Sequence, residues 1–267
     1  MKQRKLKFKN LHYGDHERQV LDLYIPADYD KQGVVLFIHG GSWKGLSKEW
    51  YEEQMKTALH DGYACAAMNY RYISEQVHMD SLMEDVHKAV ACIRDTAASH
   101  GVMLTGMMLS GASAGAHMAL LYAYTHVETA PLKPLCVYSF CGPTDLTDRA
   151  YLTENPYNKA DDMAKTLSDA CGIPFTKDTI ADADSMLAHY SPVSYVTPLC
   201  PMTVLVHGQA DMIVPYTNAL NLRNKLTENQ VEQVFINMPY DNHNLGCKGA
   251  RYECEQLFRA LAKRFLN

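Results

Sequence analysis

The stretch LSGASAGAHMALL, from Leu109 to Leu121, decides the fold of this chain. An apolar run ends there, small residues surround Ser113, and an apolar pattern with helical spacing begins immediately afterwards. Small residues suit a tight turn between a strand and a helix, because larger side chains would clash in it. In such a turn the spacing G-x-S-x-G can also hold a serine at the mouth of a parallel sheet, ready for nucleophilic attack. The stretch therefore predicts a strand-to-helix turn and leaves open whether Ser113 is catalytic or idle.

Strand and helix patterns alternate on both sides of this turn. Several apolar runs are continuous rather than alternating, which is typical of strands covered on both faces of a parallel sheet. Amphipathic segments follow most of them, and two of these segments end at Gly62 and Gly101. The predicted strands are 7–14, 18–26, 33–41, 63–72, 106–111, 134–146, 202–211 and 232–239, and the predicted helices are 50–62, 83–101, 114–126, 216–230 and 250–266. This alternation predicts a single α/β domain over residues 1–267, with a mostly parallel central sheet, helices on both faces and an antiparallel N-terminal edge.

Residues 148–198 break the alternation with short mixed helical patterns and many polar groups. A segment of this length in a compact domain is seldom bare loop. Disorder is the alternative, but four tyrosines oppose it, since disordered segments contain few aromatic residues. These tyrosines are Tyr151, Tyr157, Tyr190 and Tyr195. We expect a small insertion that partly caps the carboxyl edge of the sheet, where ligands bind in open α/β folds.

Composition excludes several classes of protein. The 267 residues carry a formal net charge of −5 and no long basic run, so nothing indicates nucleic-acid binding. No apolar stretch is long enough to cross a bilayer, and no apolar segment of a signal peptide follows the basic N-terminus MKQRKLKFKN. The eight cysteines form no C-x-x-C pair and lie mostly in apolar runs, which favours reduced, buried thiols over a thiolate zinc site or disulfides. We expect a cytoplasmic protein that binds neither nucleic acid nor membrane.

Two further residues lie where a catalytic serine would need them. A serine hydroxyl requires a base, and the base requires an orienting acid. His243, in MPYDNHNLG, follows the last predicted strand, and Asp211, in VLVHGQAD, ends the strand before it. Because parallel strands end at one edge of a sheet, we expect both residues on the same rim as Ser113, in the order Ser, Asp, His. Asp145, in CGPTDL, is the rival acid, and a helix cap or an Asx turn is the alternative for either aspartate.

A glycine loop completes the candidate site. The tetrahedral intermediate of acyl transfer carries an oxyanion, which needs positioned N–H donors. The motif HGGSW, His39–Trp43, follows the third predicted strand, and Gly40 and Gly41 let the backbone turn its N–H groups inward without a Cβ clash. Ala114 offers one more N–H at the start of the helix. A glycine turn with a structural tryptophan is the alternative interpretation of this motif.

Together these motifs resemble the α/β-hydrolase family, and most closely its esterase branch related to hormone-sensitive lipase. That branch includes small bacterial carboxylesterases that remove acetyl or feruloyl groups from plant polysaccharides. The resemblance rests on LDLYIP, HGGSW, NYRY, EDVHKAV, GASAG, HGQADMIVP and DNHNLG, and it extends from about Val20 to the end of the chain.

The resemblance implies Ser113 as nucleophile, His243 as base and Asp211 as its orienting acid. It also implies that the backbone N–H groups of Gly41, Ser42 and Ala114 form an oxyanion hole. In addition, it implies a substrate-binding loop that includes Gly40 and Trp43. Many members of this branch have a third glycine where this chain has Ser42, so the path of the loop can differ.

We therefore expect a serine carboxylesterase that hydrolyses small-molecule esters through an acyl-enzyme, without a metal or an organic cofactor. The insertion is polar and contains tyrosines rather than an apolar lid, which favours short acyl groups and a sugar or aromatic leaving group. Acetyl or feruloyl groups on carbohydrate are candidate substrates. Two alternatives stay open: an arylformamidase, because kynurenine formamidases share an HGG-x-W loop, and a catalytically silent binding protein with the same fold.

Overall fold

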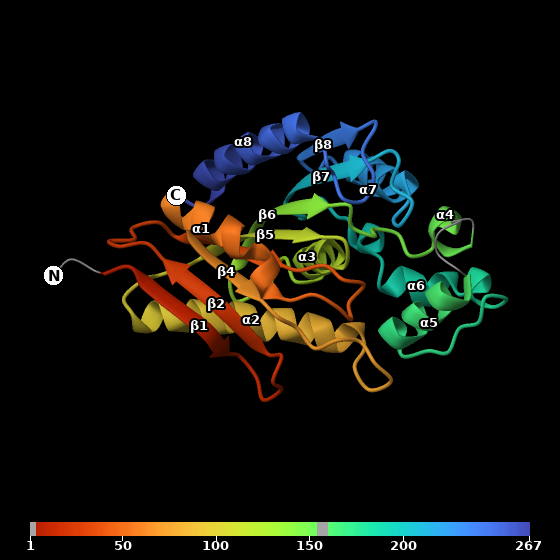
Figure 1. The fold of residues 1–267 in the computed structure, drawn as a ribbon, viewed down its shortest axis with the longest axis horizontal. Coiled ribbons are helices and arrows are strands. Elements are labelled where there is room, and N and C mark those ends of the chain that lie inside the picture. The colour runs from red at the N-terminus through yellow and green to blue at the C-terminus, as the bar shows by residue number, and fades with distance from the viewer. Residues whose placement is uncertain (1–3, 154–159) are drawn as a thin grey trace.

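An eight-stranded sheet forms the centre of the computed structural model, which describes residues 4–153 and 160–267 (Figure 1). The strands are β1 (Leu6–His12), β2 (Val20–Ile25), β3 (Gly33–Ile38), β4 (Ala64–Met68), β5 (Gly106–Ala112), β6 (Lys133–Phe140), β7 (Met202–Gly208) and β8 (Gln233–Met238). Their order across the sheet is β1-β2-β4-β3-β5-β6-β7-β8. The pairs β1–β2 and β2–β4 are antiparallel, and all other neighbouring strands are parallel. Strands β3 to β8 therefore bring their carboxyl ends to one edge.

Helices cover both faces of this sheet (Figure 1). One face carries α1 (Glu52–His60), preceded by a 3₁₀ turn, and α8 (Lys248–Phe265). The other face carries α2 (Met79–Ser99), α3 (Ala114–Thr125) and α7 (Tyr216–Glu228), which share the larger hydrophobic core. All residues of α3 except its last are buried. A helix that is apolar around its whole circumference is typical of the centre of a core.

The predicted fold class is confirmed, and the differences lie at the ends of elements. The strand predicted over 63–72 ends at Met68. The last hydrogen bond between β4 and β2 follows it, from the amide of Asn69 to the carbonyl of Val20. The helix predicted from residue 83 begins at Met79, because Met79 and Leu82 also bury their side chains in the core. Neither end carries a proline or glycine signal that the sequence could have used.

The segment expected to be an insertion folds into short helices: α4 (Arg149–Leu152), α5 (Ala160–Cys171), α6 (Asp184–His189) and the 3₁₀ turns Ile180–Asp182 and Pro192–Tyr195. Figure 1 shows α4, α5 and α6 beyond the carboxyl ends of β5 and β6. The insertion also touches the glycine loop, since Lys44 Nζ donates to Thr166 Oγ1 in α5 at 2.9 Å. That it caps a substrate remains a prediction.

Two of the four insertion tyrosines, which we expected to suit a sugar or aromatic leaving group, are not exposed. Tyr151 and Tyr190 are buried, at 4% and 9% exposure, because they pack into the core that the insertion shares with the domain. The hydroxyl of Tyr195 is used within the insertion, where it donates to the carbonyl of His189 at 2.9 Å. Tyr157 lies outside the described residues.

All eight cysteines are described as free thiols, and six of them are buried. Burial raises the pKa of the Cys65 and Cys136 thiols to about 12, which keeps both protonated. Within the described ranges, none of the helices combines the length and the apolarity needed to cross a bilayer.

Two glycines let the helix after Ser113 approach the sheet closely. A Cβ on Gly111 would lie 2.4 Å from the carbonyl carbon of Gly115, inside the turn itself. A Cβ on Gly115 would lie 2.0 Å from the carbonyl oxygen of Ile38 and 2.5 Å from that of His39. Gly115 thus packs against the end of the neighbouring strand β3, a contact that only the strand order reveals.

Gly115→Ala is therefore expected to lower the free energy of unfolding by about 3 kcal/mol or more, because two backbone carbonyls would have to move. Gly249→Ala is the matched control. It lies in α8 with no heavy atom within 4 Å of an added Cβ, and it should gain up to about 1 kcal/mol from helix propensity. Urea unfolding of both variants measures the difference. Equal stability of the two variants would contradict the close approach of α3 to β3.

Candidate active site

Ser113 occupies the turn between β5 and α3 in a strained conformation. Its φ of 54° and ψ of −125° lie outside the regions that non-glycine residues favour. Hydrogen bonds hold it on both sides: its amide donates to the carbonyl of Phe140 at 2.8 Å, and its carbonyl accepts from the amide of His117 at 3.0 Å. Such a conformation costs on the order of 1–3 kcal/mol and persists only where the surroundings enforce it. The half-buried Ser113 thus stands at the carboxyl edge of the sheet, at the N-terminus of a central helix.

Asp211 and His243 form a hydrogen-bonded pair at the same edge. Asp211 follows β7 and His243 follows β8, and His243 Nδ1 lies 2.8 Å from Asp211 Oδ2. Since a carboxylate only accepts, Nδ1 carries the proton and leaves Nε2 of a neutral His243 with its lone pair. The carboxylate is fully buried, whereas the imidazole is 16% exposed. This is the arrangement that a general base and its orienting acid require.

The ionised form of Asp211 is strongly favoured. Burial by itself raises the pKa of this carboxyl, but hydrogen bonds from His207 and His243 outweigh burial and hold the pKa well below its usual range. The amides of Ile213 and Val214 add two bonds of 2.9 Å each to Oδ1. Asp211 therefore remains an anion at neutral pH despite its burial.

Ser113 and His243 form no hydrogen bond among the described residues, although both follow parallel strands that end at the same edge. The loops after β7 and β8 are joined to each other, since the amide of Ala210 donates to the carbonyl of Asp241 at 3.0 Å. Catalytic hydrogen bonds are often long without substrate and shorten when it binds. The structure thus places Asp211 and His243 in contact, and Ser113 on the same rim.

Asp145, the alternative acid, forms hydrogen bonds to residues other than His243. Its Oδ1 accepts from the amide of Thr147 at 3.0 Å and from the hydroxyl of Thr147 at 2.6 Å. Its Oδ2 accepts from the side-chain amide of Asn221 in α7 at 2.9 Å. Asp145 therefore closes an Asx turn and ties it to α7, with both carboxylate oxygens occupied.

The glycine loop lies directly against the serine turn. A Cβ on Gly40 would lie 2.7 Å from the carbonyl oxygen of Ala112 and 3.3 Å from Cβ of Ser113. Gly41, Ser42 and Trp43 follow with φ values of +100°, +52° and +60°. The loop meets Ser113 because β3 is the sheet neighbour of β5. The expected roles of the Gly41, Ser42 and Ala114 N–H groups remain predictions.

Trp43 requires a correction. We expected it to contact substrate, but its side chain is buried at 2% exposure. Its indole N–H donates to Nδ1 of His117 at 3.3 Å, and Nε2 of His117 lies 2.8 Å from the carbonyl oxygen of Tyr190. Trp43 therefore supports the glycine loop from beneath and connects it through α3 to the insertion.

Sequence reasoning missed the residues that clamp this loop. Arg18 contacts the start of the loop and the chain just beyond it: its Nη2 lies 3.4 Å from His39 Nε2 and 3.2 Å from the carbonyl oxygen of Leu46. The Tyr70 hydroxyl donates to the carbonyls of His39 and Gly40, at 2.9 and 3.1 Å. The motif NYRY was a signal for Tyr70. Arg18 had none, because it stands at the start of a predicted strand and outside every quoted motif.

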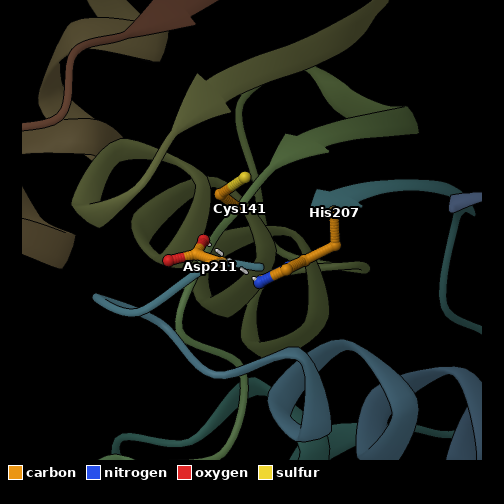
Figure 2. A group of neighbouring side chains, drawn as sticks. All are labelled: Cys141, His207 and Asp211. Atoms are coloured by element: carbon orange, nitrogen blue, oxygen red, sulfur yellow. Dashed lines mark ion pairs between the residues drawn. The ribbon is translucent and has the colours of Figure 1, made fainter. Parts of the chain in front are cut away.

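One group of buried side chains could hold a metal ion. One ligand atom each of Cys141, His207 and Asp211 lies within 4.8 Å of the other two (Figure 2). These groups already have partners: His207 Nε2 is 2.9 Å from the carbonyl oxygen of Val214, and burial raises the pKa of the Cys141 thiol strongly. A metal ion would have to displace a thiol proton and the bond to Val214, so the contacts favour a hydrogen-bonded group.

A cavity of about 600 Å³ lies between α2, α3 and the end of the insertion. None of the candidate catalytic residues lines it. The candidate site is therefore defined by the residues at the carboxyl edge and not by this cavity.

Two buried histidines beneath the loop make stability depend on pH. Burial lowers the pKa of His39 and of His117 to about 4, and Arg18 adds to the effect at His39. In the unfolded chain a histidine titrates near 6.5, so the unfolded state takes up these protons first as the pH falls. The free energy of unfolding should be intact above about pH 6.5 and should fall toward pH 4, by up to about 3 kcal/mol per histidine. Asp211 affects stability at lower pH. Its lowered pKa stabilises the fold above about pH 3.8, and this stabilisation is lost as the pH falls below that value.

Urea unfolding at pH 7, 5.5 and 4.5 measures this dependence. His117→Gln should flatten the profile, whereas His60→Gln should leave it unchanged because the His60 side chain is 90% exposed. A wild-type profile that stays flat between pH 7 and 4.5 would show that these two imidazoles titrate normally.

Comparison with known proteins places this geometry in context. The BD-FAE family model matches residues 21–226. The chain is 27% identical over 213 residues to a probable isoprenylcysteine alpha-carbonyl methylesterase of Oryza sativa subsp. japonica, covering 77% of this chain and 50% of that protein. It is 28% identical over 184 residues to a kynurenine formamidase of Salmo salar, covering 67% of this chain and 60% of that protein. The chain thus spans about half of the length of these curated relatives.

Among solved structures, esterase B of Lactobacillus rhamnosis has a TM-score of 0.75 at 20% identity. The match covers 98% of this chain and 87% of that one. At this level of identity the similarity supports the fold and not the activity.

Proposed function

The chain belongs to the BD-FAE family, and from this premise we propose that it is a serine carboxylesterase acting through an acyl-enzyme. The observation that carries the proposal is the 2.8 Å pair of His243 and Asp211, on the edge where Ser113 stands in a strained turn. An idle serine in a structural turn gives no reason for a buried, anionic acid that orients a partly exposed imidazole at the same edge.

In the proposed reaction His243 Nε2 takes the proton of Ser113 as Oγ attacks the ester carbonyl. The proton then passes from Nε2 to the leaving alcohol, and the acyl group remains on Oγ. A water molecule next gives a proton to Nε2 and attacks the acyl carbon. Nε2 then returns that proton to Oγ as the acyl–Oγ bond breaks, which releases the acid and restores Ser113. Asp211 stabilises the imidazolium that forms in both halves of the reaction. The N–H groups of Gly41, Ser42 and Ala114 are proposed to bind the oxyanion.

The surroundings of the pair favour a short acyl group and an aromatic or sugar leaving group. Trp43 and His117 fill the region beneath the glycine loop, which supports a shallow acyl site. Met212 and Ile213 follow Asp211, Tyr240 precedes His243 by three residues, and all three side chains are exposed. An exposed tyrosine offers an apolar face and a hydroxyl, which suits a sugar or an aromatic ring. Tyr240 thus takes the place of the insertion tyrosines as the proposed rim residue.

Formamidase activity is the second candidate, supported by the similarity to the kynurenine formamidase. Arylformamide hydrolysis would use the same nucleophile, base and oxyanion donors, with an amine instead of an alcohol as the leaving group. The two candidates therefore differ in the leaving group and not in the catalytic residues.

A substrate panel tests the proposal. We expect higher kcat/KM on p-nitrophenyl acetate and butyrate than on the palmitate, and slower turnover of N-formylkynurenine than of the acetate. Acetylated xylo-oligosaccharides and methyl ferulate test the leaving-group proposal. Preference for the palmitate would refute the short acyl site, and preference for N-formylkynurenine would favour the formamidase. Absence of both turnover and fluorophosphonate labelling would favour a silent binding protein.

A further inference from the structure

His207, at the end of β7, lies next to the candidate triad acid but cannot itself be the base. Its side chain is 2% exposed, and its Nε2 lies 2.9 Å from the carbonyl oxygen of Val214 and 3.3 Å from Asp211 Oδ2. A carbonyl and a carboxylate only accept, so Nε2 carries a proton, which it donates to Val214 with Asp211 Oδ2 close by. With no lone pair and no access to solvent at this nitrogen, His207 has no route to a substrate. Figure 2 shows its imidazole directed at the carboxylate of Asp211.

The contacts of His207 close the turn that presents Asp211. The imidazole holds the carbonyl of Val214, and the amide of the same Val214 donates to Asp211 Oδ1 at 2.9 Å. The amide of Ile213 shares Oδ1, also at 2.9 Å. On the other oxygen, His207 and His243 approach Oδ2 from their separate strands, at 3.3 and 2.8 Å.

Four N–H groups therefore surround the carboxylate of Asp211. Those of Ile213, Val214 and His243 form hydrogen bonds to it, and His207 Nε2, bonded to Val214, lies 3.3 Å from Oδ2. Because these groups hold both oxygens of the carboxylate, its rotation is restricted. Three of the four donors belong to the Asp211 turn or to His207, and only His243 lies on the β8 loop. The contacts from Ile213, Val214 and His207 thus hold Asp211 independently of His243, and the position of Oδ2 depends on His207.

We propose that His207 is a positioning residue, which fixes the Asp211 turn and thereby sets the Asp211–His243 hydrogen bond on which turnover depends. This inference rests on the proposed function for its effect on rate, but the hydrogen bond itself can be observed without any substrate. A well-packed histidine that only fills space at the end of β7 would have no influence on that bond.

Two substitutions separate positioning from packing. His207→Gln retains an N–H donor near the place of Nε2, whereas His207→Leu retains volume and loses the donor. We expect the His207→Leu variant to lose about 10- to 100-fold in kcat with little change in KM, the range for loss of a hydrogen bond to a charged group. The His207→Gln variant should keep most of the kcat.

Tyr216→Leu is the matched control for packing. The Tyr216 ring packs edge-on against His207 with 6.1 Å between centroids, so its loss should destabilise the same region without removing a donor to Asp211. Its kcat per folded molecule should match that of the wild type. Equal kcat losses in His207→Leu and Tyr216→Leu, at equal loss of stability, would overturn the proposal.

The second readout is the far-downfield proton NMR signal of the His243 Nδ1–H bonded to Asp211. It should be present in the wild type and in His207→Gln, and shifted or lost in folded His207→Leu. An unchanged signal in His207→Leu would refute the positioning role even if all forms proved inactive on esters. Inactive proteins with the expected signals would refute the proposed function and leave the positioning role standing.

A metal site formed by the three residues in Figure 2 would behave differently from a positioning residue. If Cys141, His207 and Asp211 bound Zn²⁺, turnover would change on adding Zn²⁺ or a chelator, and Cys141→Ser would remove this response. Cys247→Ser, at the exposed thiol, controls for metal binding elsewhere. Zn²⁺-dependent turnover that needs Cys141 and not Cys247 would overturn the proposal, and the positioning role predicts no such dependence.

Discussion

Ser113→Ala is expected to lower ester turnover by about four to six orders of magnitude, because removing the proposed nucleophile would disable the whole catalytic unit. The strained turn should survive, since alanine and serine have the same backbone preferences and the bonds that hold the turn come from the backbone. Thermal stability should therefore stay close to that of the wild type. The effect is measured as kcat/KM on p-nitrophenyl acetate and as loss of covalent labelling by a fluorophosphonate.

Ser110→Ala provides the matched control for this prediction. Ser110 lies three residues earlier, is 1% exposed within β5, and carries the same hydroxyl away from the turn. This variant should keep its labelling and nearly all of its turnover. If Ser113→Ala were labelled as well as the wild type, another residue would be the nucleophile.

Asp211→Asn is expected to reduce turnover by about ten-thousand-fold, because an amide nitrogen facing His243 Nδ1 would force the wrong tautomer. The remaining carbonyl oxygen can still accept from the amides of Ile213 and Val214, so the turn should keep its shape. The loss should therefore appear in kcat in a folded protein. Circular dichroism and thermal unfolding verify that the variant is folded before the rate is compared.

Asp145→Asn should have the opposite profile. It weakens the bonds to Thr147 and Asn221 that tie its turn to α7, at a cost of about 1 kcal/mol, but it does not touch His243. Turnover per folded molecule should stay near the wild-type value. Collapse of turnover in Asp145→Asn, with an active Asp211→Asn, would reverse the assignment and make Asp145 the acid.

The sequence by itself was sufficient for the fold class. Continuous apolar runs alternate with amphipathic segments, and these patterns are local, because each records which faces of one element are buried. The turn at Ser113 could be recognised for the same reason, since its glycines and its strand and helix neighbours are adjacent in the chain. The sequence also placed Asp211 and His243 just after strands, which in a parallel sheet puts them at one edge.

Only the tertiary structure decided which segments contact one another at the candidate site. The sequence does not state that β3 and not β4 lies beside β5, yet this order brings the glycine loop onto Ser113 and places Gly115 against Ile38. The burial of the insertion tyrosines could not be predicted either. A tyrosine in a polar segment can face solvent or, like Tyr151, the core that the insertion shares with the domain. Burial of a side chain depends on partners distant in sequence, and no local pattern records it.

The residues that hold the site in place were likewise invisible before folding. Arg18 lies 21 residues before His39 and touches it only because the turn after β1 folds over the glycine loop. His207 begins the motif HGQADMIVP, but the motif does not reveal its contact with Asp211, which exists because the chain reverses between Asp211 and Val214. Chemically reactive groups leave a signature in the sequence, because the reaction restricts which residues can serve. Supporting contacts leave a weaker signature, since any donor that the fold brings to the right place can provide them.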